Sequence, residues 1–180
     1  HLHNVIQYYL WVKKAKKGNK DALVQLILQE QQQFYHLAYT YVGNEHDALD
    51  ALEQMIVILY EKIHQLKDDT VFYSWSKTIL VNECRAILNK KHRVSFIEDE
   101  KPVELTVNPI DQLDDELTLE HYLTILSPVH KEAIQLKYLL DYDYETIAEL
   151  TNVSVGTAKT RVFYALKKLR AQFGEENFHE

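Results

Sequence analysis

Apolar residues recur at intervals of three and four along most of this chain, which is the period of an amphipathic helix. In the first half they form three stripes, over residues 23–41, 48–63 and 72–87. Either Asn44 or Asp47 is placed to cap the start of the second stripe. Because no alternating segment of useful length competes with these stripes, we expect the first half to be a small helical bundle.

The second half carries helix-start signals at three positions. Ser127 and Pro128 suit the first turn of one helix, and Asp143 can cap a short helix over "YETIAELT". After a tight turn, Ser154 is placed to cap a long helix that runs to about Gln172. A short helix, a turn of three or four residues and a longer basic helix form the helix-turn-helix arrangement.

The composition is that of a folded globular protein. The chain is 46% hydrophobic and 26% charged, and its 180 residues suffice for one ordinary domain or two small ones. The longest apolar run, residues 55–60, is far shorter than the roughly 20 residues that span a bilayer. Since no signal-peptide pattern opens the chain, we expect a cytoplasmic protein that does not insert into membranes. The lone Cys84 is expected to pack as a small apolar residue.

The formal net charge of −7 is a sum of blocks with opposite signs. Residues 85–93 carry four cations and no acid, and residues 151–170 carry five cations and no acid. Between them, residues 94–120 hold nine acids against one lysine, a net charge of −8. This block contains two prolines and lacks a sustained helical pattern before about Leu117, so we interpret it as an extended linker. A plain solvated connector fits it equally well.

Together these patterns predict an all-α fold. We expect two small helical domains joined by an acidic linker, with a helix-turn-helix as the C-terminal domain. We place the first domain at residues 1–94, the acidic flexible linker at 95–118 and the second domain at 119–180.

The second helix of a helix-turn-helix enters the major groove of DNA with its first turns facing the base edges. Gly156 and Ala158 are small, which lets this helix approach closely. Lys159 and Thr160 are placed to reach base edges or phosphates, and Arg161 suits a phosphate. Three cations further along fit backbone contacts or plain solubilising charge equally well, namely Lys167, Lys168 and Arg170.

The C-terminal pattern closely resembles that of the extracytoplasmic-function (ECF) sigma factors of bacterial RNA polymerase, through "YETIAEL" and then "NVSVGTAKTRVFYALKKLR". The N-terminal half is similar to that family's core-binding and promoter-melting domain, through "YHLAYTYVGNEHDALDALEQMIVILYEKI" and then "FYSWSKTILVNECRAILNKKHR". The resemblance covers about residues 23–170 and keeps the two domains in the family's order.

The resemblance implies a sigma factor that directs core RNA polymerase to specific promoters and initiates transcription, of a stress or envelope-response regulon. The first domain would bind core polymerase and recognise and melt the minus-ten element, and the second would bind the minus-thirty-five element. An anti-sigma factor is expected as a further partner. No small-molecule substrate, cofactor or metal is implied, and no enzymatic activity.

The family's functional positions fall on three sets of residues in this chain. The set for core polymerase is Asp47, Asp50, Leu52, Gln54, Ile56 and Tyr60. The set for the minus-ten element is Phe72, Tyr73, Asn82, Arg85, Lys90, Lys91 and Arg93. The set for the minus-thirty-five element is Ser154, Thr157, Lys159, Thr160, Arg161, Phe163 and Tyr164. Within these sets, Phe163 fits packing equally well. Phe72 and the nearby Trp75 stand at helical spacing, where an aromatic side chain is more often in the core than stacked on a base, and Trp75 is expected in the core.

Two other classes of protein compete with a sigma factor. A stand-alone helix-turn-helix transcriptional regulator explains the C-terminal motif, but it leaves "VNECRAILNKKHR" and the acidic linker without a role. A helical hydrolase or metal enzyme is disfavoured because the nine histidines are scattered and no H-E-x-x-H pattern occurs.

Overall fold

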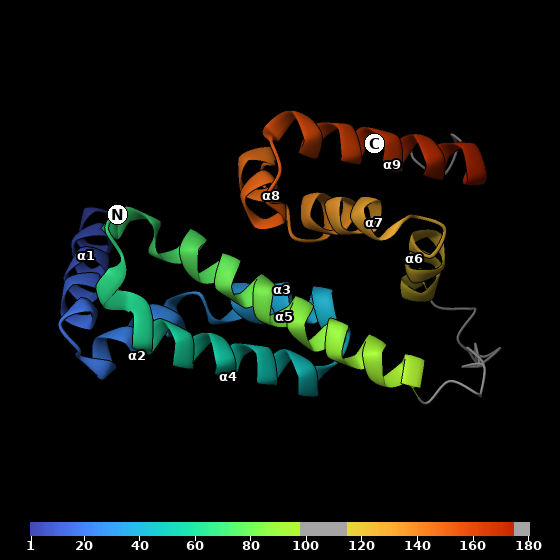
Figure 1. The fold of residues 1–180 in the computed structure, drawn as a ribbon. Helices are drawn as coiled ribbons and strands as arrows, with labels where there is room; N and C mark the ends of the chain where they lie inside the picture. Colours follow the sequence, from blue (N-terminus) through green and yellow to red (C-terminus); the bar gives the residue numbers. More distant parts are fainter. Residues whose placement is uncertain (98–114, 175–180) are drawn as a thin grey trace. The chain divides into compact units, whose positions relative to one another are not determined.

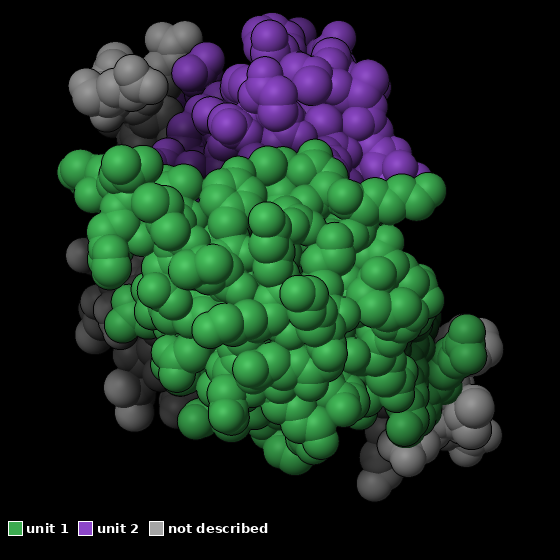
Figure 2. Space-filling view, turned by 90° about the vertical axis from the view of Figure 1, so that its left-hand side faces the viewer, with its two compact units in different colours: residues 1–96 green, residues 97–180 purple. Residues whose placement is uncertain are grey.

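A computed structural model describes residues 1–97 and 115–174, and the described residues are helical with no strand (Figure 1). The chain divides into two compact units, His1–Phe96 and Ile97–Glu180 (Figure 2). The elements of the first unit are α1 (Leu2–Lys16), α2 (Lys20–Gln29), α3 (Gln31–Val42), α4 (Glu45–Lys62), the short 3-10 turns η1 (Ile63–Gln65) and η2 (Asp69–Val71), and α5 (Phe72–Ile97). Those of the second are α6 (Asp115–Leu123), α7 (Pro128–Ile134), η4 (Gln135–Leu139), α8 (Tyr144–Thr151) and α9 (Val155–Phe173). The all-α expectation is confirmed.

In the first unit the helices begin where side chains can cap them. Asn44 caps α4, because its Oδ1 accepts a hydrogen bond from the backbone N–H of Asp47 at 2.9 Å. Gly43 ends α3 with φ of 78°, a left-handed conformation that glycine adopts without a side-chain clash. Of the two caps that the sequence offered for α4, the structure selects Asn44.

The first stripe of the sequence analysis, residues 23–41, proves to be two helices. The chain breaks at Glu30, which has φ of −118° and ψ of 29°, so that α2 and α3 are separate elements. No glycine or proline marks this break, and the apolar period continues across it. Helix α1 precedes all three stripes; it buries only Val12 and Ala15, which leaves too narrow a stripe to stand out in the sequence.

The core of the first unit is built mainly from α2 to α5, and α1 adds Val12 and Ala15. Its largest fully buried side chains include Phe34 on α3, Met55 and Leu59 on α4, and Phe72 and Leu80 on α5. Cys84 is buried as expected, and burial raises the pKa of its thiol to about 12. Burial of side chains of this size stabilises the unit by roughly 1.5–3 kcal/mol each.

The second unit packs α6, α7 and α9 around one apolar cluster. The cluster is formed by Leu123, Leu126, Ala133, Ile134, Val162, Ala165 and Leu169. Ser127 and Pro128 start α7, while Asp143 and Ser154 cap α8 and α9 by accepting backbone hydrogen bonds at 2.8 and 3.1 Å. All three helix starts that the sequence predicted are therefore present, although the Ser127 side chain accepts no capping hydrogen bond.

Most of the expected acidic linker, residues 98–114, lies outside the described residues. Helix α5 continues to Ile97 on one side of that segment and α6 begins at Asp115 on the other. Among the described helices, none has the length and apolar character needed to cross a membrane.

Candidate nucleic-acid and polymerase interfaces

A tight turn joins α8 to α9 in the second unit. Asn152 ends α8 in the left-handed conformation, with φ of 55° and ψ of 48°, which Asn tolerates better than most residues. The backbone N–H of Val153 donates to the carbonyl of Ala148 at 3.0 Å, and Ser154 then caps α9. This geometry holds α9 at a fixed angle to α8, as a helix-turn-helix requires.

Helix α9 has a buried face and an exposed one. Ala158, Val162, Ala165 and Leu169 are buried at intervals of three and four residues. Six of the seven residues expected to contact the minus-thirty-five element are exposed, and Arg161 is half-buried. The side chain of Phe163 is 61% exposed, so core packing does not account for it.

The exposed face of α9 joins aromatic rings to positive charge. The rings of Phe163 and Tyr164 lie edge to face, with their centroids 5.4 Å apart. The Nζ of Lys159 lies 5.7 Å from the centroid of the Tyr144 ring, and the Nζ of Lys137 lies 4.4 Å from the same centroid. Lys137 and Tyr144 were missed at the sequence level, because they belong to η4 and α8 rather than to the basic run.

In the first unit, α5 presents a polar face opposite its buried one. Leu80, Val81 and Cys84 are buried, whereas Asn82 between them is exposed. Arg85 is half-buried, and the three later cations of the expected minus-ten set are exposed, namely Lys90, Lys91 and Arg93. A mid-helix Asn costs helix propensity without adding to the core, which favours a polar task for Asn82.

Phe72 of the minus-ten set is a core residue and Tyr73 is half-buried beside it, so the assignment of both as DNA contacts is corrected. The side chain of Phe72 is fully buried. The ring of Tyr73 packs beside Phe72 and Phe34, with centroid distances of 5.2 and 6.2 Å, and its hydroxyl donates to the carbonyl of Leu26 at 2.7 Å. Burial raises the pKa of Tyr73. Trp75, expected in the core, is only half-buried.

The loop before α5 is fixed to α1. The hydroxyl of Tyr8 donates to the backbone carbonyl of Asp69 at 2.5 Å, and the Nζ of Lys16 lies 2.8 Å from the Asp69 carboxylate. Asp68 accepts hydrogen bonds from the backbone and hydroxyl of Thr70, and these bonds lower the pKa of its carboxyl. The loop therefore has a defined shape beside the start of α5.

Helix α4 carries the set expected to contact core polymerase. Asp50, Gln54, Ile56 and Tyr60 are exposed, and Leu52 is half-buried. An apolar groove of about 420 Å³ runs between α4 and the pair α2 and α3; its apolar lining includes Val24, Ile27, Leu28, Leu49, Leu52 and Ile56. The apolar residues of α4 therefore contact both the core and an exposed groove. Their spacing in the sequence did not distinguish these two groups.

Asp47 departs from the expected polymerase contact. Its side chain is buried, one carboxylate oxygen accepts a hydrogen bond from the Asn44 amide at 2.8 Å, and the same oxygen pairs with the Nζ of Lys91. The hydrogen bond from Asn44, followed by that from Lys91, lowers the pKa of the Asp47 carboxyl. A carboxylate held in this way is not presented on the surface for a partner, so its assignment as a polymerase contact is corrected.

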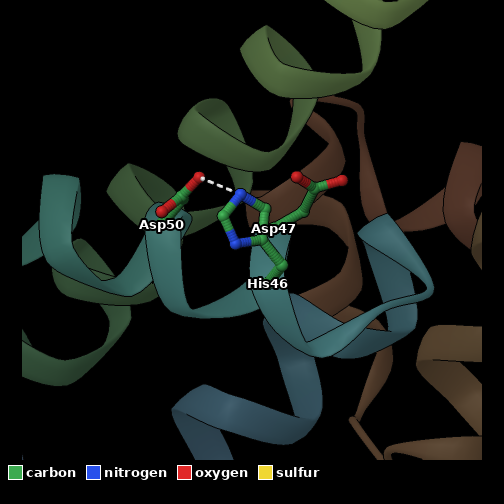
Figure 3. A group of neighbouring side chains, drawn as sticks. All are labelled: His46, Asp47 and Asp50. Atoms are coloured by element: carbon green, nitrogen blue, oxygen red, sulfur yellow. Dashed lines mark ion pairs between the residues drawn. The ribbon is translucent and has the colours of Figure 1, made fainter.

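His46 and Asp50 lie beside Asp47 at the start of α4 (Figure 3). The Nε2 of His46 lies 3.4 Å from Asp50 Oδ2, and ligand atoms of all three residues fall within 4.8 Å of one another. In Figure 3 the Asp47 carboxylate lies on the far side of the imidazole from Asp50. Because Asp47 is already engaged by Asn44 and Lys91, this group does not form a free set of metal ligands.

Comparisons with known proteins match both units. The sequence model of Sigma-70 region 2 matches residues 26–94, and that of Sigma-70, region 4 matches residues 116–169. RNA polymerase sigma factor SigV of Bacillus subtilis is 32% identical over 164 residues, covering 91% of this chain and 98% of the relative. ECF RNA polymerase sigma factor SigW of the same organism is 26% identical over 175 residues, covering 89% and 94%.

Solved structures agree on the fold. CnrH, solved with the cytosolic domain of CnrY, has a TM-score of 0.67 at 18% identity, over 92% of this chain and 96% of that one. Sigma factor RpoE of Bartonella quintana, solved with the anti-sigma factor NepR, has a TM-score of 0.66 at 24% identity, over 85% and 96%. The relatives account for both halves of the chain, which a stand-alone regulator did not. The chain belongs to the ECF sigma factors, which direct core RNA polymerase to promoters and initiate transcription.

Proposed function

We propose that the two units divide promoter recognition between them. Residues 1–94 bind core polymerase and recognise and melt the minus-ten element, and residues 119–180 bind the minus-thirty-five element. The two region matches support this division, because one falls in each unit. Residues 95–118, which include the last residues of α5 and the first of α6, connect them as an acidic linker.

The observation that carries the proposal is the exposed face of α9. Lys159 and Thr160 lie near the start of this helix, where a recognition helix meets base edges, and Arg161 suits a phosphate. The exposed rings of Phe163 and Tyr164 offer apolar contacts, of the kind that the methyl group of thymine accepts. Ser154 caps the helix and donates its hydroxyl to Thr157 Oγ1 at 2.9 Å, which leaves the Thr157 hydroxyl to donate to a phosphate.

On α5, the minus-ten contacts are Asn82, Arg85, Lys90 and Arg93. Asn82 offers an amide to an unpaired base, and the three cations attract the phosphates of the opened strand. Three residues are left out of the contact set. Lys91 is paired with Asp47, Phe72 is buried in the core, and the half-buried Tyr73 donates its hydroxyl to the Leu26 carbonyl.

The groove on α4 is the docking surface for core polymerase. Ile56, 39% exposed, lines a contiguous apolar groove, the kind of surface that marks a contact with another protein, and Tyr60, 47% exposed, lies one turn further along α4. Leu52 lines the groove, and Asp50 and Gln54, exposed on the same helix, supply polar contacts.

An anti-sigma factor covers polymerase-binding surfaces of this chain while it is inactive. RpoE was solved with such a partner, which supports the idea. The chain acts in the bacterial cytoplasm, where promoters and polymerase are found, serves a stress or envelope-response regulon, and performs no chemistry of its own.

Run-off transcription with core polymerase over a set of promoters tests the proposal. We expect initiation from a subset, and little binding of promoter DNA by the chain without core. Ile56→Glu, in the groove, should lower affinity for core by roughly tenfold or more, since a charge is buried on docking. The control is Leu10→Glu, at a similarly exposed apolar residue of α1, and this variant should bind core with unchanged affinity. No initiation together with no binding to core would overturn the proposal.

A further inference from the structure

Helix α5 continues well past the point at which it is buried. Over residues 72–95, whose side chains the structure describes, the last buried one is Cys84, and every side chain from Leu88 to Ser95 is exposed. In Figure 1 the last turns of α5 run on past the start of α4. A helical segment exposed on all sides is marginally stable in water, so its position depends on tertiary contacts.

One such contact is the ion pair between Lys91 and Asp47. It lies two turns beyond Cys84, and it joins the exposed part of α5 to the first turn of α4. The Asp47 side chain is 8% exposed, whereas that of Lys91 is 58% exposed. The carboxylate is the fixed partner, and the long lysine side chain reaches to it.

Asn44 fixes the direction of that carboxylate. Its side-chain oxygen caps α4 at the backbone N–H of Asp47, at 2.9 Å, and its side-chain amide donates to Asp47 Oδ2 at 2.8 Å. The oxygen and the nitrogen of the Asn44 side-chain amide therefore both form hydrogen bonds with Asp47. Asp47 cannot turn toward solvent without losing a hydrogen bond that its buried oxygen needs.

The direction of Lys91 around α5 supports the same conclusion. Successive residues of an α-helix are separated by about 100° around its axis, so Lys91 lies about 180° from Asn82. Lys90 and Arg93 lie within about 80° of Asn82 by the same arithmetic. The polar face that meets the opened strand therefore contains Lys90 and Arg93, and Lys91 points to the opposite side, toward α4.

We propose that Asn44, Asp47 and Lys91 form a positioning element that holds the basic end of α5 against the start of α4. Lys91 is a positioning residue and does not contact DNA, and Asp47 does not contact polymerase. The element keeps Lys90 and Arg93 in place for the strand. The positioning element rests on the proposed function in one respect, which is that α5 carries the face that binds the opened DNA strand.

The test measures binding of a fluorescent single-stranded minus-ten oligonucleotide to the full chain bound to core polymerase, over a range of salt concentrations. Asp47→Asn and Lys91→Met should each weaken binding by roughly threefold or more, because both release the end of α5. Lys91→Met should leave the slope of log K against log salt unchanged. Lys90→Met, the matched control, should reduce the slope by about 0.7, the value for one phosphate contact on a single strand.

If Lys91 instead binds a DNA phosphate in competition with Asp47, the two substitutions should change oligonucleotide binding in other ways. Removing the acid in Asp47→Asn would then strengthen binding, and Lys91→Met would reduce the salt slope as Lys90→Met does. Either outcome overturns the proposal. Lys91→Arg should restore binding to near the wild-type value, because the guanidinium can still reach the carboxylate.

A second measurement does not depend on polymerase or DNA. Urea unfolding of the free chain with Asp47→Asn, Lys91→Met and the double variant should show coupling, the double variant being little worse than either single one. Amide exchange over residues 88–95 should accelerate in each variant. Additive effects and unchanged exchange would sink the positioning element. If coupling is found but the wild-type chain with core does not bind the strand, the proposed function fails and the element stands.

Discussion

Helices α5 and α9 each carry a run of positive charge, in "RAILNKKHR" and in "KTRVFYALKKLR", but the two helices are held in different ways. Helix α9 is buried at regular intervals from Ala158 to Leu169, so packing fixes its exposed cations along that whole length. Helix α5 is buried only as far as Cys84, and one of its later cations is paired with an acid. Similar charge runs in a sequence can therefore contain both ligand-facing and structural charges.

The largest expected contrast is between two phenylalanines that the sequence analysis assigned to DNA contacts, Phe72 to the minus-ten element and Phe163 to the minus-thirty-five element. Phe72 is fully buried at the start of α5, so Phe72→Ala should lower the free energy of unfolding by about 3–5 kcal/mol, because the substitution leaves a cavity. Phe163 is 61% exposed on α9, so Phe163→Ala should lower the free energy of unfolding by less than about 0.5 kcal/mol. Urea unfolding of both variants measures this. Phe163→Ala should instead reduce transcription from promoters that have a minus-thirty-five element; a large loss of stability in this variant would contradict the exposed position.

Amide exchange compares the two helix ends directly. Residues 162–169 of α9 should exchange roughly 100-fold more slowly than residues 88–95 of α5, because local opening of the latter exposes no buried side chain. Mass spectrometry of the free chain measures both segments in one sample. Equal protection would mean that the exposed end of α5 is held by more than the contacts described.

Within α9, the position of a lysine along the helix should decide its effect. Lys159→Ala, near the start of the helix, should reduce transcription by roughly tenfold at promoters with a minus-thirty-five element, the loss expected for one base contact. Lys168→Ala, also exposed but about two and a half turns further on, is the matched control and should have a smaller effect. Promoters without the element should respond to neither. Equal losses at both kinds of promoter would assign Lys159 to folding.

The smallest effect concerns a cap in the second unit. Hydrogen bonds from Thr146 lower the pKa of the Asp143 carboxyl from 3.8, so the ionised cap stabilises the folded state above that pH. This contribution should disappear as the pH falls through the lowered pKa. In urea unfolding, the difference between the wild-type chain and Asp143→Asn should therefore be greatest near neutral pH and vanish in strong acid. A difference that stays constant with pH would show that the charge of Asp143 adds nothing.

Local chemistry explains which parts of the fold were predictable. Asn44, Asp143 and Ser154 cap helices through contacts within three residues of themselves, so their roles could be inferred from the sequence. The break at Glu30 and the helix α1 carry no such local signal, and they depend on how the helices pack.

The candidate site was predictable where exposure follows from helical spacing, as on α9. It was not predictable where a residue type suits two environments, as Phe72 suits both DNA and a core. For Lys91, the spacing from Asn82 already placed it on the opposite side of α5, but its partner Asp47 lies 44 residues away in the sequence, and only the fold brings the two together.

Cys84 has a practical consequence for experiments on this chain. It is the only cysteine, it is fully buried with its Sγ 4.0 Å from the carbonyl of Ala38, and its pKa of about 12 leaves almost no thiolate near neutral pH. Maleimide dyes should therefore leave the folded chain unlabelled. A cysteine introduced on the surface of each unit can then carry a fluorophore, and energy transfer between the two dyes can follow how the units rearrange as polymerase engages a promoter.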